Sequence, residues 1–259
     1  MTEKTPSEQL LQWHITAGAD ETIGDVPVNR FDLPRKPPPA AESQPDVFVP
    51  AAPPAPAPSL LSAELQTDTL ARRASTLEEL REIVANFDEC PLKATATKMV
   101  FGAGNPQARL MIIGEAPGAE EDRQGLPFVG PSGHLLDLML KSIGLTRPDV
   151  YISNILPWRP PANRKPSESE IALFTPFVRR HIALVKPKVL LLLGGSAVSA
   201  LMHTNAGITK TRGRWLTYTD EDLTIDVMAS FHPAFLLRTP AQKKLSWRDF
   251  LAVKKNLAV

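Results

Sequence analysis

The sequence predicts an α/β protein of three layers, in which helices cover both faces of a central, mostly parallel sheet of four strands. Short apolar runs alternate with amphipathic segments along the second half of the chain, and this alternation is typical of parallel sheets with helical crossovers. Glycine, proline or polar residues bound the apolar runs, which indicates buried strands.

The four strands are expected at 108–114, 149–155, 187–195 and 222–233. The third run, PKVLLLLGG, is the most typical of a parallel strand because its centre is apolar throughout. Helices are expected between and after the strands, at 132–144, 167–186, 196–202 and 245–258, and an earlier one should begin at a capping box of Ser75 and Glu78. Ligands of such sheets bind beyond the carboxyl ends of the strands.

Composition divides the chain into three regions. Residues 1–33 form an acidic extension with a short helix expected at 7–18. Residues 34–58 are expected to be an extended linker, because ten of these 25 residues are proline, which neither donates to a ladder nor continues a helix. Residues 59–259 are expected to form the folded domain, which starts with a helix.

The net charge of +1 conceals an uneven distribution. Residues 1–85 carry 7 Lys and Arg against 13 Asp and Glu, whereas residues 86–259 carry 22 against 15. A basic body is compatible with binding to a polyanion such as nucleic acid, although a well-solvated surface gives the same counts.

Targeting and redox features narrow the class of protein. Cys90 is the single cysteine, which excludes an internal disulfide and cannot hold a structural zinc by itself. No apolar run reaches the roughly 18 residues of a membrane-spanning helix, and the N-terminus has no signal-peptide pattern. We therefore expect a soluble, cytoplasmic protein that works as a monomer.

Polar residues follow three of the predicted strands. Glu115 is the first polar residue after the first strand, Asn154 closes the second, and His232 closes the fourth, directly before Pro233. An amide offers both a donor and an acceptor, as reading a base edge requires. Each residue alone is more often structural, but the three are expected at one sheet edge. The turn LGGSAV suits a phosphate, and Phe128 by itself reads as a core residue.

Five ordered segments resemble a family 4 uracil-DNA glycosylase: VFGAGNPQARLMIIGEAPGAEEDRQGLPFVGPSGHLLD, NILPWRPPANRKPSESEI, PKVLLLLGGSA, KTRGRW and SFHPAFLLR. They stand in the order and spacing of that family and cover residues 87–259, so the acidic extension and the linker lie outside the pattern. The resemblance implies a monofunctional DNA repair enzyme that flips out uracil, hydrolyses its N-glycosidic bond and leaves an abasic site.

The resemblance also implies roles for the residues at the strand ends. Glu115 takes the position of the carboxylate that orients water or steadies the cationic sugar, and His232 takes the position that contacts the uracil O2. Phe128 takes the position that stacks on the flipped base. Asn154 takes the position that reads the uracil edge, and Ala116 is expected to line the same pocket.

Further residues are expected to hold the DNA. Glu121 matches a second acidic position, whose role stays open. Phosphate contacts are expected from Ser132, Lys210, Arg212, Arg214 and Arg238, and a wedge into the vacated base stack from Leu236 or Leu237. The partner is then DNA containing uracil, which places the protein at the nucleoid.

The chain departs from the family at an iron–sulfur site. The family holds a four-iron four-sulfur cluster with four cysteines, and the corresponding positions here are Phe87, Cys90, Trp158 and Phe174. One thiolate cannot ligate such a cluster. We therefore expect no cofactor, with the three aromatic side chains filling the volume of the cluster as a hydrophobic plug.

Several alternatives stay open at this point. A related subgroup traps its product through a histidine inserted after the Asn-bearing strand, and the stretch RPPANRKPSESE has no histidine, so ordinary turnover is expected. The second hypothesis is a protein that binds uracil or abasic DNA with little catalysis, and the third is activity on other deaminated bases. The segment QLLQW at 9–13 resembles motifs that dock on sliding clamps, so the extension is a candidate site for a repair or replication partner, although an amphipathic helix packed on the domain fits it better.

Overall fold

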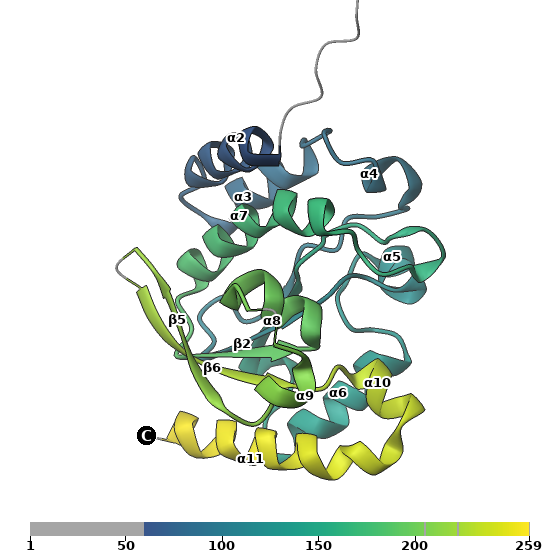
Figure 1. Cartoon of the computed structure of the whole chain (residues 1–259), viewed down its shortest axis with the longest axis vertical. Coiled ribbons are helices and arrows are strands. Elements are labelled where there is room, and N and C mark those ends of the chain that lie inside the picture. Colours follow the sequence, from purple (N-terminus) through teal and green to yellow (C-terminus); the bar gives the residue numbers. More distant parts are fainter. Residues whose placement is uncertain (1–59, 205, 222, 259) are drawn as a thin grey trace, which may run out of the picture. The chain divides into compact units, whose positions relative to one another are not determined.

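The computed structural model describes residues 60–204, 206–221 and 223–258 (Figure 1). The chain divides into two units, 1–54 and 55–259, and all described residues belong to the second. The helix expected at 7–18 and the linker expected at 34–58 lie outside the described residues. No helix in the described part is both long and apolar enough to cross a membrane.

A six-stranded sheet forms the centre of the domain, in the order β1-β3-β2-β4-β6-β5. Four of its strands are parallel and correspond to the four that the sequence predicts: β2 (Leu110–Gly114), β3 (Val150–Asn154), β4 (Val189–Leu193) and β6 (Leu223–Ser230). The three-layer α/β prediction is confirmed.

The predicted count of four strands is too small, because one antiparallel strand is added at each edge of the sheet. These are β1 (Ala103–Gly104), which pairs with β3, and β5 (Trp215–Asp220), which pairs with β6. β1 is only two residues long. β5 alternates between exposed and less exposed residues, and a partly exposed edge strand carries less of the apolar signal by which buried strands are recognised.

Helices cover both faces of the sheet (Figure 1). Alternate residues of β2 divide between two cores: Met111 and Ile113 join one, and Leu110 and Ile112 join the other, as expected from the period of two in a strand. The first core packs against α3 and α7, and the second against α6 and α11. The helices are α2 (Leu60–Arg72), α3 (Leu77–Ala85), α4 (Leu92–Thr95), α5 (Ala119–Gln124), α6 (Pro131–Ser142), α7 (Glu168–Val185), α8 (Gly195–Met202), α9 (Ile208–Thr211), α10 (Pro233–Arg238) and α11 (Lys243–Ala258).

The start of α3 lies one residue later than predicted. Thr76, not Ser75, is the N-cap, and its side chain accepts a hydrogen bond from the Glu79 backbone N–H at 3.1 Å. The Ser75 backbone N–H in turn donates to the Glu79 carboxylate at 2.6 Å. The predicted pair of Ser75 and Glu78 is therefore wrong, because Thr76 caps the helix and Glu79 is the residue whose side chain returns to the backbone.

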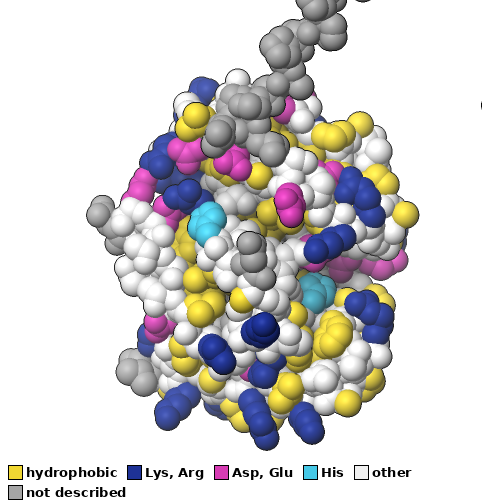
Figure 2. Space-filling view, in the orientation of Figure 1, with side chains coloured by type: hydrophobic (Ala, Val, Ile, Leu, Met, Phe, Trp, Pro, Cys, Tyr) yellow, Lys and Arg dark blue, Asp and Glu magenta, His cyan; other side chains and the backbone are white. Residues whose placement is uncertain are grey.

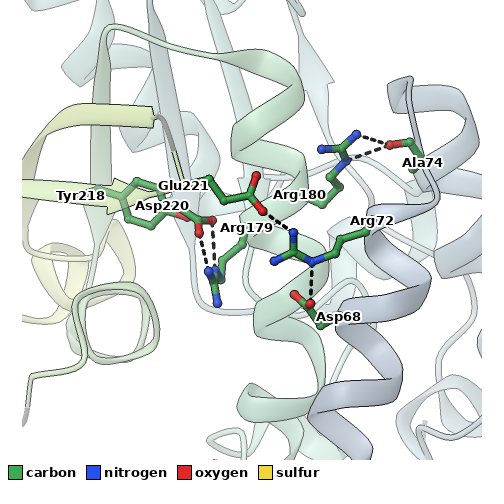
Figure 3. Close-up of polar contacts among 8 residues, drawn as sticks. All are labelled: Asp68, Arg72, Ala74, Arg179, Arg180, Tyr218, Asp220 and Glu221. Atoms are coloured by element: carbon green, nitrogen blue, oxygen red, sulfur yellow. Dashed lines mark hydrogen bonds and ion pairs between the residues drawn. The ribbon is translucent and has the colours of Figure 1, made fainter.

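Arginines fix α2 and the β5–β6 turn to α7 (Figure 3). Arg180 donates to the Ala74 carbonyl through Nε at 2.8 Å and Nη2 at 2.5 Å, and Arg179 holds Asp220 in a two-point ion pair. Arg72 of α2 bridges Asp68 and Glu221. These contacts make α2 part of the domain, although it lies before the segments that resemble the family.

Strand register brings the carboxyl ends together. Gly114 at the end of β2 pairs with Asn154 at the end of β3, and Ile113 pairs with Leu192 of β4. Leu193 of β4 then lies opposite Ser230 of β6. Residues that follow these strands therefore emerge at one edge of the sheet, as the alternation of strands and helices predicts.

Candidate functional site

A cavity of about 620 Å³ lies at this edge and is called the strand-end cavity below. It collects residues from four separate segments of the chain. Of the residues that the sequence singles out, it is lined by Glu115, Ala116, Glu121, Phe128, Ser132, Asn154, His232 and Arg238. All the residues predicted to bind or act on uracil thus share one cavity.

Asn154 lines this cavity and has an unpaired side-chain oxygen. Its side chain is 5% exposed, and its Oδ1 has no hydrogen-bond partner among the described residues. Gly114 allows the approach of this oxygen, because a Cβ at Gly114 would lie 2.5 Å from Oδ1 and 2.6 Å from the Phe128 ring. A buried acceptor without a partner costs about 1–3 kcal/mol, so the arrangement is stabilised when a ligand supplies the missing donor.

The Phe128 ring is buried and lines the cavity at the same time, so both sequence interpretations apply to it. Its φ of 55° lies in the left-handed region that non-glycine residues rarely adopt. Two neighbours hold this backbone. Arg147 donates hydrogen bonds to the carbonyls of Pro127 and Phe128, and Gly133 leaves room for the Phe128 carbonyl, which would lie 1.7 Å from an added Cβ.

Glu121 holds the loop that carries Phe128. Its carboxylate accepts backbone hydrogen bonds from Gly118 at 3.1 Å, Val129 at 2.9 Å and Gly130 at 2.8 Å, and the side chain is 9% exposed. Backbone N–H groups satisfy a buried carboxylate well. Glu121, the second acidic position, therefore shapes the cavity by tying the loop at 129–130 to α5.

His232 caps α10 with its imidazole. Its Nδ1 accepts a hydrogen bond from the Ala234 backbone N–H at 3.2 Å, so in the neutral ring Nε2 carries the proton. Burial lowers the pKa of His232 to about 4, and the nearby Arg238 acts in the same direction. The ring lies 5.5 Å from the Phe128 ring at an interplanar angle of 31°. The residue is therefore a neutral donor at physiological pH.

Glu115 is half-buried directly after β2, and its Oε2 accepts a hydrogen bond from the Ser196 hydroxyl at 2.6 Å. Ser196 belongs to the turn LGGSAV, which the sequence offers as a phosphate site. In the structure, the side chain in that turn contacts a carboxylate of the chain itself. Among the described residues, no Lys, Arg or His forms an ion pair with Glu115.

Two residues expected at the DNA are placed elsewhere. Arg212 is paired with Asp249, and its Nη2 also donates to the Leu245 carbonyl at 2.9 Å, so its guanidinium holds α11, and the phosphate contact expected of it stays a prediction. Burial raises the pKa of Asp249. Leu236 is fully buried and cannot form the wedge, whereas Leu237 is 43% exposed.

The remaining cations predicted at phosphates are accessible. Lys210 and Arg214 are exposed on and after α9, although neither lines the strand-end cavity, and Arg238 is exposed at its rim. Figure 2 shows that Lys and Arg predominate among the charged side chains in the lower part of the view, where α9 and α11 lie in Figure 1. This basic surface is suited to a polyanion.

Sequence reasoning missed residues on the loop after β3. Asn163, Arg164 and Lys165 line the cavity, and Arg164 makes a two-point ion pair with Glu170 at 2.9 and 2.6 Å. Phe235 of α10 lines it as well. The signal was available, because this loop begins at the carboxyl end of the strand that carries Asn154.

The positions that correspond to cluster ligands lie together in one apolar core, called the aromatic cluster below and made of Phe87, Cys90, Trp158, Phe174 and Phe177. The Phe87 ring contacts the Phe174 and Phe177 rings edge to face, with distances between ring centroids of 5.9 Å and 5.3 Å. Burial raises the pKa of the Cys90 thiol. One protonated thiol among aromatic rings does not match the donor set of a four-thiolate cluster. No group of three potential metal ligands occurs within residues 60–204, 206–221 and 223–258.

Comparison with known proteins agrees with this geometry. A family model for the uracil DNA glycosylase superfamily matches residues 101–251. A Type-4 uracil-DNA glycosylase of Sulfurisphaera tokodaii is 37% identical over 185 residues, which cover 70% of this chain and 84% of that protein. One of Thermotoga maritima is 40% identical over 168 residues, covering 63% and 86%. Because the matched segment exceeds half of the chain and holds the whole strand-end constellation, this chain belongs to the uracil-DNA glycosylase superfamily.

Proposed function

We propose that Glu115, Phe128, Asn154 and His232 are the residues with which this uracil-DNA glycosylase releases uracil from DNA and leaves an abasic site. The observation that carries the proposal is the buried, unpaired Oδ1 of Asn154 in a cavity that also holds a carboxylate and a neutral histidine. The amide matches the polar edge of uracil. The carboxylate and the histidine match the positive charge on the sugar and the negative charge on the base that develop when the bond breaks.

Recognition begins when the nucleotide leaves the duplex. Uracil inside a stack cannot reach the cavity, so the base must be flipped, at a cost of a few kcal/mol. Stacking on the Phe128 ring, worth about 1–3 kcal/mol, offsets part of this cost. The Asn154 amide accepts from uracil N3–H and donates to O4. Cytosine has no proton on N3 and carries an amino donor at position 4, so it leaves the buried amide unpaired and is rejected.

Bond cleavage separates a positive sugar from a negative base. The bond between C1′ and N1 breaks, its electron pair leaves with uracil, and a water oxygen bonds to C1′ and gives up a proton, which balances the one that the uracil anion takes up. Glu115 stabilises the cationic sugar and orients the water. The Nε2–H of His232 donates to uracil O2, where negative charge develops, and one such donor is typically worth about 3–4 kcal/mol in the transition state.

The surroundings of the cavity hold the DNA. Arg238 and Ser132 lie at the cavity, and together with the exposed Lys210 and Arg214 they are the residues proposed to contact phosphates. Leu237 is the exposed residue of the predicted pair, so it is the one that enters the vacated stack. With no histidine on the loop after β3, the product is released without a stable crosslink.

The aromatic cluster replaces the iron–sulfur site in this proposal. Its support is the donor set: three of the four thiolate positions carry buried aromatic side chains, and the rings of Phe87 and Phe174 pack edge to face. Iron analysis and an absorbance scan of the purified protein should show no iron and no visible chromophore. A stoichiometric brown chromophore would overturn this part of the proposal without affecting uracil release.

The decisive experiment is uracil release from a labelled duplex by the full chain, compared with Glu115→Ala and Asn154→Ala. We expect release by the parent protein and a large loss in both variants, with no adduct that resists denaturation. Binding without release, unchanged by either substitution, would instead indicate a protein that only binds lesions. The same assay with a duplex carrying hypoxanthine tests activity on other deaminated bases.

A further inference from the structure

The structure gives the catalytic carboxylate a side-chain partner that is itself buried. Ser196 is 8% exposed, and its hydroxyl donates to Glu115 Oε2 at 2.6 Å. The two residues are 81 positions apart in the chain, but β2 and β4 are paired in parallel, so the residue after β2 and the first turn of α8 meet at the sheet edge. The contact follows from the register of the sheet.

Helix capping does not account for this hydroxyl. Ser196 is the second residue of α8, and the N-cap is Gly194, which has no side-chain cap hydrogen bond. A serine in the first turn of a helix commonly bonds to a nearby backbone group. Here the hydrogen bond that the structure gives the Ser196 side chain runs across the cavity wall to Glu115.

The contact restricts one carboxylate oxygen and leaves the other for the reaction. Oε2 is held by Ser196, whereas Oε1 has no hydrogen bond among the described residues. The first turn of α8 also brings the positive end of a helix dipole to the negative carboxylate, which is a favourable arrangement. A flexible Glu side chain is thus held in one orientation before the DNA arrives, which lowers the ordering cost of the reaction.

We propose that Ser196 is a positioning residue that holds Glu115 in its reactive orientation. Ser196 acts on the reaction through the carboxylate and not through the DNA. The proposal rests on the role proposed for Glu115, and it adds a residue that belongs to the turn otherwise read as a phosphate site.

The first test measures single-turnover uracil release by the full chain and its Ser196→Ala variant over a range of enzyme concentrations. We expect the maximal rate to fall about tenfold, as for loss of a hydrogen bond to a charged group, while the half-saturating concentration stays within about twofold. Ser196→Thr should restore most of the rate. Ser199→Ala is the matched control, because Ser199 is exposed on the same helix.

A double-mutant cycle separates positioning from packing. Once Glu115→Gln has removed the carboxylate, adding Ser196→Ala should cause no further loss of rate. Any of three results would overturn the proposal. These are an additive loss of rate in the double variant, an unchanged maximal rate in Ser196→Ala, and a raised half-saturating concentration in Ser196→Ala without a change of maximal rate. Melting temperatures of all variants show whether a lost rate comes from lost folding.

A binding measurement distinguishes this inference from the proposed function. A duplex with a cationic pyrrolidine in place of the target sugar imitates the charge that Glu115 faces, and a neutral tetrahydrofuran duplex is its control. Ser196→Ala should weaken binding of the cationic duplex about fivefold relative to the neutral one. If the parent chain releases no uracil, the proposed function fails. The ratio of binding to the cationic and the neutral duplex still tests the role of Ser196, and an unchanged ratio in Ser196→Ala would overturn that role.

Discussion

The strand-end cavity and the aromatic cluster both border Asn154, yet they are built in opposite ways. The cavity gathers a carboxylate, an amide and an imidazole, and it leaves the amide oxygen unpaired. The aromatic cluster is closed by rings in edge-to-face contact, and the space between it and Asn154 is about 20 Å³. The difference agrees with the proposal that the cavity carries the chemistry and that the aromatic cluster contributes stability.

The largest effect is expected at the residue that the two regions share. Asn154→Ala removes the amide that pairs with uracil and should lower the single-turnover rate of uracil release by about a thousandfold. Binding to an abasic duplex should persist, because the phosphate contacts remain. A rate within tenfold of the parent would show that the unpaired oxygen is not the reader of the base.

The aromatic cluster should respond in stability and not in chemistry. Phe174 is 1% exposed, so Phe174→Ala should lower the free energy of unfolding by about 3–5 kcal/mol, measured by urea denaturation. The rate of uracil release per folded molecule should stay close to that of the parent. Leu138→Ala is the control, since Leu138 is 65% exposed. A rate loss in folded Phe174→Ala would show that the two regions are coupled.

A histidine that folding keeps neutral lies beside each region: His232 lines the strand-end cavity, and His181 borders the same small space as Phe174 of the aromatic cluster. Burial lowers the pKa of His232 to about 4 and that of His181, which bonds the Tyr151 hydroxyl at 2.9 Å, to about 3. Both pKa values lie below the ordinary value of about 6.5. Between pH 6.5 and these lower values, the unfolded chain therefore binds more protons than the folded chain. Stability should therefore be full above pH 6.5 and fall with decreasing pH, by at most about 1.4 kcal/mol per pH unit for each histidine.

Urea denaturation between pH 7.5 and 5 measures this slope. His181→Phe should reduce it, whatever the variant does to stability at pH 7.5. An equal slope in His181→Phe and the parent would mean that the buried histidine of the cluster side does not titrate as proposed.

The smallest effect is expected at the remaining cysteine. Cys90 is buried, and burial raises the pKa of its thiol, so it is protonated at neutral pH and plays no nucleophilic role. Cys90→Ser should lower the free energy of unfolding by about 1 kcal/mol, because a hydroxyl replaces sulfur in an apolar core. Uracil release should be retained, and its loss in a folded variant would contradict the separation of the two regions.

The sequence by itself determined the parallel strands, the helices on both sides of them and the residues at the strand ends. These follow from local signals. An apolar run such as 189–193 indicates a buried strand without knowledge of the strand that pairs with it, and the first polar residue after such a run marks the edge where the candidate site lies. The substitution of cluster ligands by Phe87, Trp158 and Phe174 is equally a matter of sequence. The exposed edge strand β5 was missed because alternating polar residues carry a weak signal.

Only the tertiary structure decided which side chains are free to act. Arg212 and Arg214 are indistinguishable in the sequence, but Arg212 forms an ion pair with Asp249 of α11, whereas Arg214 is exposed. Leu236 and Leu237 are adjacent, and the orientation of α10 buries one and exposes the other. Ser196 and Glu115 meet only because β2 and β4 are neighbours in register. A hydrogen bond or an ion pair depends on distances between remote segments, and such distances exist only once the chain has folded.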